Sequence, residues 1–242
     1  MKKFLAIVLT LALCLGLCSL ASAETYKIGI LAPAVTHGWV AGVAYQAEQR
    51  CKELADTVEY KLYTSNNAEE MTTQLDDLKT WGAQAIVGSV TTNPCIAVGA
   101  QAYEDRVFML TPSASSADVT ADKDNVYQVC FTDPAQGTAS AQYIAEHNLA
   151  AKVAVIYNNA DAYSTGIYQT FDAKAKELGM EIVAVSTFTD DTTDFSVQVT
   201  NAKQAGAELV FLPIYYTPAS MILKQADAID YHPIFCGSDG MD

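Results

Sequence analysis

The residues best placed to do chemistry form a loop of small hydroxyl side chains after an apolar strand. Residues 107–120, VFMLTPSASSADVT, contain this change, with Ser113, Ser115 and Ser116 in the loop. In a parallel α/β sheet such a loop lies at the carboxyl end of a strand, where open α/β folds bind their ligands. Because no base accompanies these hydroxyls locally, the pattern predicts binding of a small polar ligand and not a catalytic centre.

The usual motifs of catalysis and metal binding are missing from the sequence. It contains no G-x-S-x-G elbow, Walker loop, H-E-x-x-H or G-x-G-x-x-G motif, and its three histidines are scattered. The acidic cluster Asp190, Asp191 and Asp194 could suggest a metal. More simply, Asp194 caps the helix that follows and the other two are solvated. We therefore expect a binding protein that is not an enzyme, with no metal and no cofactor.

The first 23 residues have the features of a secretory signal peptide. Lys2 and Lys3 form a basic start, residues 4–20 are mostly apolar, and Ala21-Ser22-Ala23 is a small-residue cleavage site. A membrane anchor is the alternative, since an uncharged run of this length can span a bilayer. The polar start at Glu24 favours cleavage. We expect the mature protein outside the cytoplasm, in the periplasm or on the outer cell surface.

Charge and cysteine content narrow the range of partners. The formal net charge of −14 argues against nucleic acid and anionic lipid, because both attract basic surfaces. The predicted mature chain has four cysteines, Cys51, Cys95, Cys130 and Cys236, and none has Cys-x-x-Cys spacing. We expect buried apolar thiols, with one disulfide still possible after export.

Strand-like and helical runs alternate regularly along the chain. The strand-like runs are 26–32, 58–63, 84–88, 107–110, 126–130, 152–157, 181–187, 208–212 and 233–236. The helical runs are 38–55, 67–81, 94–103, 135–148, 161–178, 194–205 and 217–230. This alternation indicates parallel sheets covered on both faces, and nine strands exceed one doubly wound unit. We expect an N-terminal α/β lobe at 24–140 and a second α/β lobe at 141–242.

An ordered set of segments resembles one protein family. Five segments are similar to the leucine/isoleucine/valine-binding branch of type I periplasmic solute-binding proteins. They are AIVGSVTTNP (85–94), FMLTPSASSADVT (108–120), VAVIYNNADAYSTGIYQTF (153–171), TDDTTDFSVQVTNAKQAGAELVFL (189–212) and IFCGSDGMD (234–242). HGWVAGVAYQAEQRCKEL (37–54) is more similar to the sugar-binding branch. The resemblance implies a type I periplasmic-binding-protein fold with two doubly wound parallel-sheet lobes. Family members continue beyond the point that matches Asp242, so we expect the second lobe to be incomplete.

The resemblance also implies a function and its partners. Such a protein captures a branched-chain or related amino acid in a cleft between the lobes and delivers it to the membrane permease of an ABC importer. A sugar-binding protein or a ligand-sensor module of the same fold is the alternative. A monomer is expected, with a small-molecule ligand and no nucleic acid.

First-lobe residues are expected to hold the charged ends of the ligand. Thr92 matches a family hydroxyl, while Asn93 as N-cap and Pro94 as first helical residue would aim helix N–H groups at the ligand carboxylate. Alternatively, Thr92 and Asn93 only cap that helix. The resemblance implies that Ser113 meets the ligand ammonium through its carbonyl and Ser115 through its hydroxyl.

Aromatic residues and one carboxylate complete the expected site. The resemblance implies that Tyr163 and Tyr215 close over the ligand, although Tyr216 could replace Tyr215. Asp239, in the loop GSDGMD, matches an acidic residue that pairs with the ammonium; its alternative is an ordinary turn residue. Trp39 would line the cleft, or it would be a structural residue at a helix start.

Overall fold

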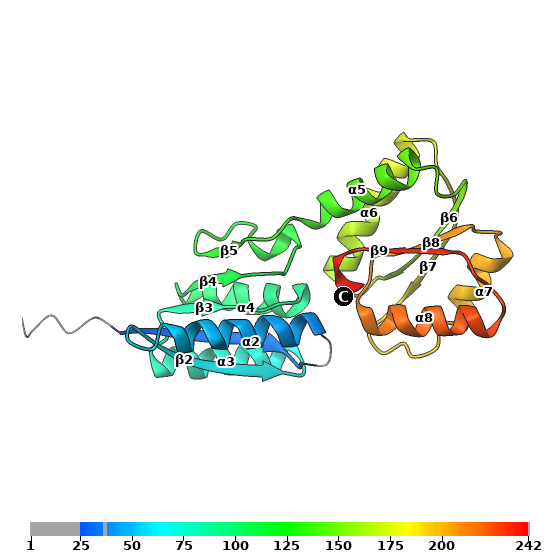
Figure 1. Ribbon diagram of the computed structural model, residues 1–242. Coiled ribbons are helices and arrows are strands. Elements are labelled where there is room, and N and C mark those ends of the chain that lie inside the picture. The colour runs from blue at the N-terminus through cyan, green and yellow to red at the C-terminus, as the bar shows by residue number, and fades with distance from the viewer. Residues whose placement is uncertain (1–24, 36–37, 242) are drawn as a thin grey trace, which may run out of the picture.

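The computed structural model describes residues 25–35 and 38–241 and divides them into two α/β lobes (Figure 1). The predicted signal peptide at 1–23 lies outside the described residues. Each lobe has its own parallel sheet, so the predicted fold class is confirmed. Among the described helices, none combines the length and apolarity needed to cross a membrane.

The first lobe contains a five-stranded parallel sheet in the order β2-β1-β3-β4-β5. Its strands are β1 (Tyr26–Pro33), β2 (Val58–Ser65), β3 (Ala85–Val87), β4 (Phe108–Thr111) and β5 (Val126–Gln128). Its helices are α2 (Gly38–Glu53), α3 (Ala68–Trp81), α4 (Thr92–Glu104) and the 3-10 helix η1 (Ala117–Val119). Helices α3 and α4 pack on the sheet through one apolar cluster, and α2 packs through a separate smaller one.

The second lobe contains a four-stranded parallel sheet in the order β7-β6-β8-β9. Its strands are β6 (Lys152–Asn158), β7 (Glu181–Phe188), β8 (Leu209–Leu212) and β9 (Ile234–Gly237). Its helices are α5 (Asp133–Glu146), α6 (Ala162–Glu177), α7 (Ser196–Gln204), α8 (Tyr216–Ala228) and the 3-10 helix η2 (Asp239–Met241). Strand β8 is buried along its whole length, since α5 and α6 cover one face of the sheet and α7 and α8 the other.

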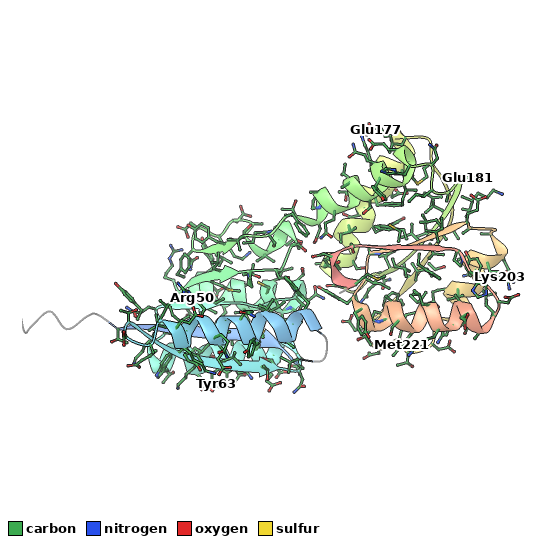
Figure 2. The ribbon with its side chains drawn as sticks, viewed as in Figure 1. Arg50, Tyr63, Glu177, Glu181, Lys203 and Met221 are labelled. Carbon is green, nitrogen blue, oxygen red and sulfur yellow. The ribbon has the colours of Figure 1, made fainter. Side chains whose placement is uncertain are left out.

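Charged side chains lie on the outside of this lobe. Figure 2 shows Glu177, Glu181 and Lys203 on its outer surface, away from the first lobe.

Figure 1 shows the red C-terminal segment, with η2, at the junction between the lobes. The carboxyl ends of the second sheet therefore face the first lobe, which brings the loops of both sheets together.

We place the lobe boundary earlier in the chain than the sequence predicted, because the helix expected at 135–148 packs with the second lobe. Helix α5 packs along α6, and Ala141 and Ile144 belong to the apolar cluster of the second lobe. A Cβ at Gly137 would collide with the Ile167 carbonyl and the Thr170 hydroxyl, so glycine permits this close approach. A division at residue 140 would cut through α5. We therefore propose a boundary in the connection at 129–132.

Two expected helix starts need correction. Helix α4 begins at Thr92 with Thr91 as N-cap, so Asn93 and Pro94 are its second and third residues. Helix α7 begins at Ser196 with Phe195 as N-cap, so Asp194 lies one residue before the cap, although its Oδ1 still accepts from the Ser196 backbone N–H at 2.9 Å. Asp190 is not simply solvated, because it accepts a hydrogen bond from Asn158 Nδ2 at 2.5 Å.

The four cysteines of the described chain are free thiols. Cys51 and Cys95 are buried, whereas Cys130 and Cys236 are half-buried. Burial raises the pKa of the Cys95 thiol to about 12, which keeps it protonated and unreactive. The predicted burial thus holds for Cys51 and Cys95, whereas Cys130 and Cys236 are only partly buried.

Candidate functional site

A cavity of about 350 Å³, counting its open mouth, lies between the two lobes. Its walls come from the carboxyl ends of strands in both sheets, where open α/β folds bind ligands. Seven of the eight residues predicted from the sequence line it: Trp39, Thr92, Ser113, Ser115, Tyr163, Tyr215 and Asp239.

Thr111, at the end of β4, shapes the first-lobe wall. Its buried hydroxyl donates to the Ser89 carbonyl at 2.6 Å and accepts from the Ala114 backbone N–H at 3.0 Å. These bonds tie the hydroxyl loop to the end of β3. The Ser113 hydroxyl in turn accepts from Trp39 Nε1 at 2.9 Å, which fixes the indole at the edge of the cavity.

The start of α4 leaves polar groups available on this wall. Thr92 is 1% exposed, and among the described residues its hydroxyl has no hydrogen-bond partner. The Thr91 N-cap makes no side-chain capping bond, and the Tyr215 phenol of the opposite wall is hydrogen-bonded to the Thr92 backbone. A buried hydroxyl without a partner is costly. A ligand carboxylate at this helix start would relieve that cost.

The second-lobe wall is built around the hydroxyl of Tyr163. This side chain is 2% exposed and donates to Asp239 Oδ1 at 2.7 Å. The Tyr163 hydroxyl oxygen also lies 2.8 Å from Ser238 Oγ and accepts from the Gly240 backbone N–H at 2.9 Å. The Tyr163 ring stacks on Tyr215 with centroids 4.7 Å apart. Tyr163 thus fixes the loop that carries Asp239.

Burial and the charge of Asp239 raise the pKa of Tyr163 well above its usual value. The phenol therefore stays protonated and remains a donor to the carboxylate. Gly240 allows the close approach, since a Cβ there would lie 2.8 Å from the Tyr163 hydroxyl and 3.0 Å from the Tyr215 ring. The Asp239 backbone N–H also donates to Gln136 Oε1 at 3.3 Å, which joins the loop to α5.

Asn93 differs from the other predicted residues because it does not line the cavity. Its Nδ2 donates to the Ala160 carbonyl at 3.1 Å, and its Oδ1 accepts from the Ala162 backbone N–H at 3.1 Å. Both polar atoms of the Asn93 amide are thus hydrogen-bonded to the backbone of the second lobe. The expected N-cap role also fails, because α4 starts one residue before it.

Asp133 is a candidate functional residue that sequence reasoning missed. It is 1% exposed at the start of α5, and within the described chain its carboxyl oxygens have no hydrogen-bond partner besides the nearby Ser115 hydroxyl. Burial raises its pKa to about 7; the Ser115 hydroxyl opposes this shift, while nearby Asp239 and Asp161 add to it. Its backbone N–H donates to the Ser115 carbonyl at 3.0 Å, so it lies behind the first-lobe wall. An acidic residue soon after a strand was the available signal, but the sequence TDPAQG is also typical of a turn.

Asp133 opens onto a second cavity between the lobes, which it lines together with Asp118 and Asp161. Asp161 is the N-cap of α6 and is 5% exposed, and burial raises its pKa to about 6. Among the described residues, no lysine, arginine or histidine lines either cavity. The junction is therefore acidic. In the described chain, no group of three or more His, Cys, Asp or Glu side chains could hold a metal ion.

Trp39 separates the polar cavity from an apolar groove. The groove lies along α2 and is lined by Val43, Ala47, Val87 and Pro112 as well as by Trp39 itself. The indole is 48% exposed, so one ring edge reaches the groove while its N–H binds Ser113. Trp39 therefore forms the boundary between a polar compartment and an apolar one.

Comparisons with known proteins agree with this architecture. The family model described as "Periplasmic binding protein" matches residues 27–242. Leu/Ile/Val-binding protein homolog 3 of Brucella melitensis is 32% identical over 161 residues, covering 66% of this chain and 44% of the relative. The chain thus spans less than half the length of that relative.

Two solved structures are similar over most of the chain. The leucine-binding protein LivK of Thermotoga maritima has a TM-score of 0.80 at 28% identity, covering 90% of this chain and 64% of that one. LivJ of Streptococcus pneumoniae, solved with isoleucine, has a TM-score of 0.78 at 27% identity, covering 90% and 65%. On the strength of the family match and these relatives, the chain belongs to the type I periplasmic binding proteins, in the leucine/isoleucine/valine-binding branch.

Proposed function

We propose that this chain captures a branched-chain or related amino acid between its lobes, outside the cytoplasm, and delivers it as a monomer to the permease of an ABC importer. The observation that carries the proposal is the division of polar groups across the cavity. Hydroxyls and a helix start line one wall, and a fixed carboxylate lines the other. A zwitterion with an apolar side chain matches this division.

The ligand carboxylate belongs at the first-lobe wall. The hydroxyl of Thr92 and the start of α4 supply donors there, and no carboxylate of that lobe lines the same cavity within the described chain. Helix N-termini favour anions through their free N–H groups and dipole. This wall therefore suits an anionic group better than a cationic one.

The ligand ammonium belongs at Asp239. Tyr163 fixes one carboxylate oxygen, which leaves the other available to accept from the ligand. The rings of Tyr215 and Trp39 then offer apolar surface for an aliphatic side chain, so Trp39, Thr92, Ser113, Ser115, Tyr163, Tyr215 and Asp239 remain our proposed ligand-binding residues.

The relatives support the same ligand class. A LivJ structure that contains isoleucine resembles this chain over 90% of its length. The relatives named above are binding proteins, which supports a role in transport and not in catalysis. A periplasmic or outer-surface location follows from the family, and export would use the predicted signal peptide at 1–23.

A thermal-shift panel tests the proposal. Leucine, isoleucine and valine should raise the melting temperature, since a ligand that binds only the folded protein stabilises it by mass action. Matched analogues dissect the site: 4-methylpentanoate lacks the ammonium, and leucinamide lacks the carboxylate. Both should give much smaller shifts than leucine. A shift with monosaccharides alone, or equal shifts with leucine and 4-methylpentanoate, would contradict the proposal.

A further inference from the structure

Asn93 makes a polar contact between the two lobes through two hydrogen bonds. It is the second residue of α4 in the first lobe, and both atoms of its amide bind the backbone of the second lobe. The partners are the carbonyl of Ala160 and the N–H of Ala162, each at 3.1 Å. A side chain that pairs with one acceptor and one donor of the opposite lobe fixes both the distance and the orientation of that lobe.

The segment that Asn93 binds is the start of α6. Ala162 is the first residue of this helix, so its N–H has no acceptor within the helix itself. The N-cap, Asp161, accepts instead from the N–H of Ser164. Asn93 therefore supplies, from the other lobe, the acceptor that the first turn of α6 lacks.

The second-lobe segment that Asn93 binds is held in place by hydrogen bonds within its own lobe. The Ala160 backbone N–H donates to Asn158 Oδ1 at 2.9 Å, and the Asn158 backbone N–H donates to Ser164 Oγ at 2.9 Å. The Ser164 hydroxyl donates to the Pro213 carbonyl at 2.6 Å. Because these bonds lie within the second lobe, opening the cleft would break the Asn93 contacts and leave the segment intact.

We propose that Asn93 is an interlobe latch, which stabilises the closed form and slows ligand release without touching the ligand. This inference rests on the proposed function in one respect, that the lobes close around a ligand. The two hydrogen bonds exist only when the lobes meet and are exchanged for water when they part. Losing two hydrogen bonds between uncharged groups should shift the balance between open and closed forms by about tenfold.

The first lobe does not need Asn93 for its own stability. Helix α4 has Thr91 as its N-cap, and the hydrogen bonds of the Asn93 amide go to the second lobe. Asn67 provides a matched control, because it is also an asparagine at a helix start. Its Oδ1 accepts from the Glu70 N–H at 2.8 Å, but this contact stays within the first lobe.

Amide hydrogen exchange of the ligand-free chain tests the latch independently of the ligand. The Ala162 amide should exchange about tenfold faster in Asn93→Ala than in the wild type. In Asn67→Ala the Glu70 amide should exchange faster while Ala162 is unchanged. Asn93→Asp keeps the acceptor for Ala162 but places a charge against the Ala160 carbonyl and near Asp161, so it should also lose protection. Equal exchange at Ala162 in wild type and Asn93→Ala would overturn the latch.

Release of isoleucine, measured by stopped-flow dilution, gives the functional readout. Asn93→Ala should release isoleucine about tenfold faster with little change in association rate, since the latch acts after the ligand has entered. Asn67→Ala should lower the melting temperature and leave release unchanged. If isoleucine does not bind the wild type, the proposed function fails while the exchange result still decides the latch. If Asn93→Ala slows association alone, the latch is wrong.

Discussion

The two walls of the cavity satisfy their polar groups in different ways. On the second-lobe wall, the Tyr163 hydroxyl, Asp239 carboxylate and Gly240 N–H are bonded to one another. On the first-lobe wall, the Thr92 hydroxyl is buried and, within the described chain, has no partner. One wall is complete before a ligand arrives, whereas the other has a group that the ligand itself must satisfy.

Because of this difference, variants on the two walls should affect ligand affinity and the stability of the folded chain in different proportions. Removing the Thr92 hydroxyl from the first-lobe wall takes away a group that is unpaired in the described chain without ligand, so it should affect binding alone. A change in the Tyr163 network breaks bonds that exist without ligand, so it should affect both. Asp133 lies at the junction behind the first-lobe wall. Because its carboxylate is costly to bury as an anion, the stability of the folded chain should depend on pH.

The largest effect is expected from Asp239→Asn. The asparagine Oδ1 can still accept from Tyr163, so the loop should keep its geometry while the negative charge is lost. A hydrogen bond to a charged group contributes about 1.5–3 kcal/mol, so calorimetry should show leucine affinity falling by about a hundredfold. The variant should bind 4-methylpentanoate as weakly as the wild type does. Unchanged leucine affinity would remove Asp239 from the ammonium site.

The next effect is the pH dependence of stability from Asp133. Its pKa rises from the usual value of 3.8 to about 7 in the folded chain, so the folded state binds this proton more tightly than the unfolded state. Its stabilising effect is complete below the usual pKa and is lost as pH rises through about 7.

Urea unfolding should therefore show the wild type about 2 kcal/mol less stable at pH 7 than at pH 5, within the limit of about 1.4 kcal/mol per pH unit for one proton. Asp133→Asn should flatten this dependence, leaving the smaller contribution of Asp161, whose pKa of about 6 acts in the same direction. A pH dependence identical in wild type and variant would show that Asp133 does not titrate in this range.

Tyr163→Phe should lower both affinity and stability. The ring and its stacking on Tyr215 remain, but Asp239 and the Gly240 N–H lose their common partner. We expect leucine to bind about tenfold more weakly and the free energy of unfolding to fall by about 1 kcal/mol. Tyr231→Phe is the control, because its hydroxyl donates to the Ala207 carbonyl away from the cavity. It should lose stability only; a similar loss of affinity in both variants would refute the positioning role.

The smallest effect is expected from Thr92→Val. The substitution preserves shape and removes a buried hydroxyl that is unpaired in the described chain. Thermal melting without ligand should be unchanged or slightly raised, since an unsatisfied buried hydroxyl is unfavourable. Leucine affinity should fall about fivefold through the loss of one hydrogen bond. A variant that melts at a lower temperature and binds leucine normally would contradict the claim that the Thr92 hydroxyl contributes to binding and not to stability.

The alternation of strands and helices could be predicted because it rests on local patterns. Near-continuous apolar runs such as ELVFL become buried parallel strands, and each was expected near its observed position. Convergence of the strand-end loops follows from the fold, which explains why Ser113, Tyr163 and Asp239 were found together.

The partners of individual side chains could not be predicted in the same way. Asn93 has good helix-capping chemistry, and only the position of the opposite lobe reveals that it caps α6 instead of α4. Asp133 follows Thr132 in a typical turn sequence, and its burial depends on packing between α5, α6 and the hydroxyl loop. Such contacts join residues distant in sequence, so no local pattern records them.

The position of Trp39 has a spectroscopic consequence. The chain has two tryptophans, and the ammonium groups of Lys27 and Lys61 lie 5.2 and 5.0 Å from the ring centroid of Trp81. Trp81 does not line the cavity, so its emission should be insensitive to ligand. Trp39 is half-exposed at the cavity edge, and a ligand against its ring would displace water and shift its emission. One indole thus reports occupancy while the other serves as an internal reference, without any added dye.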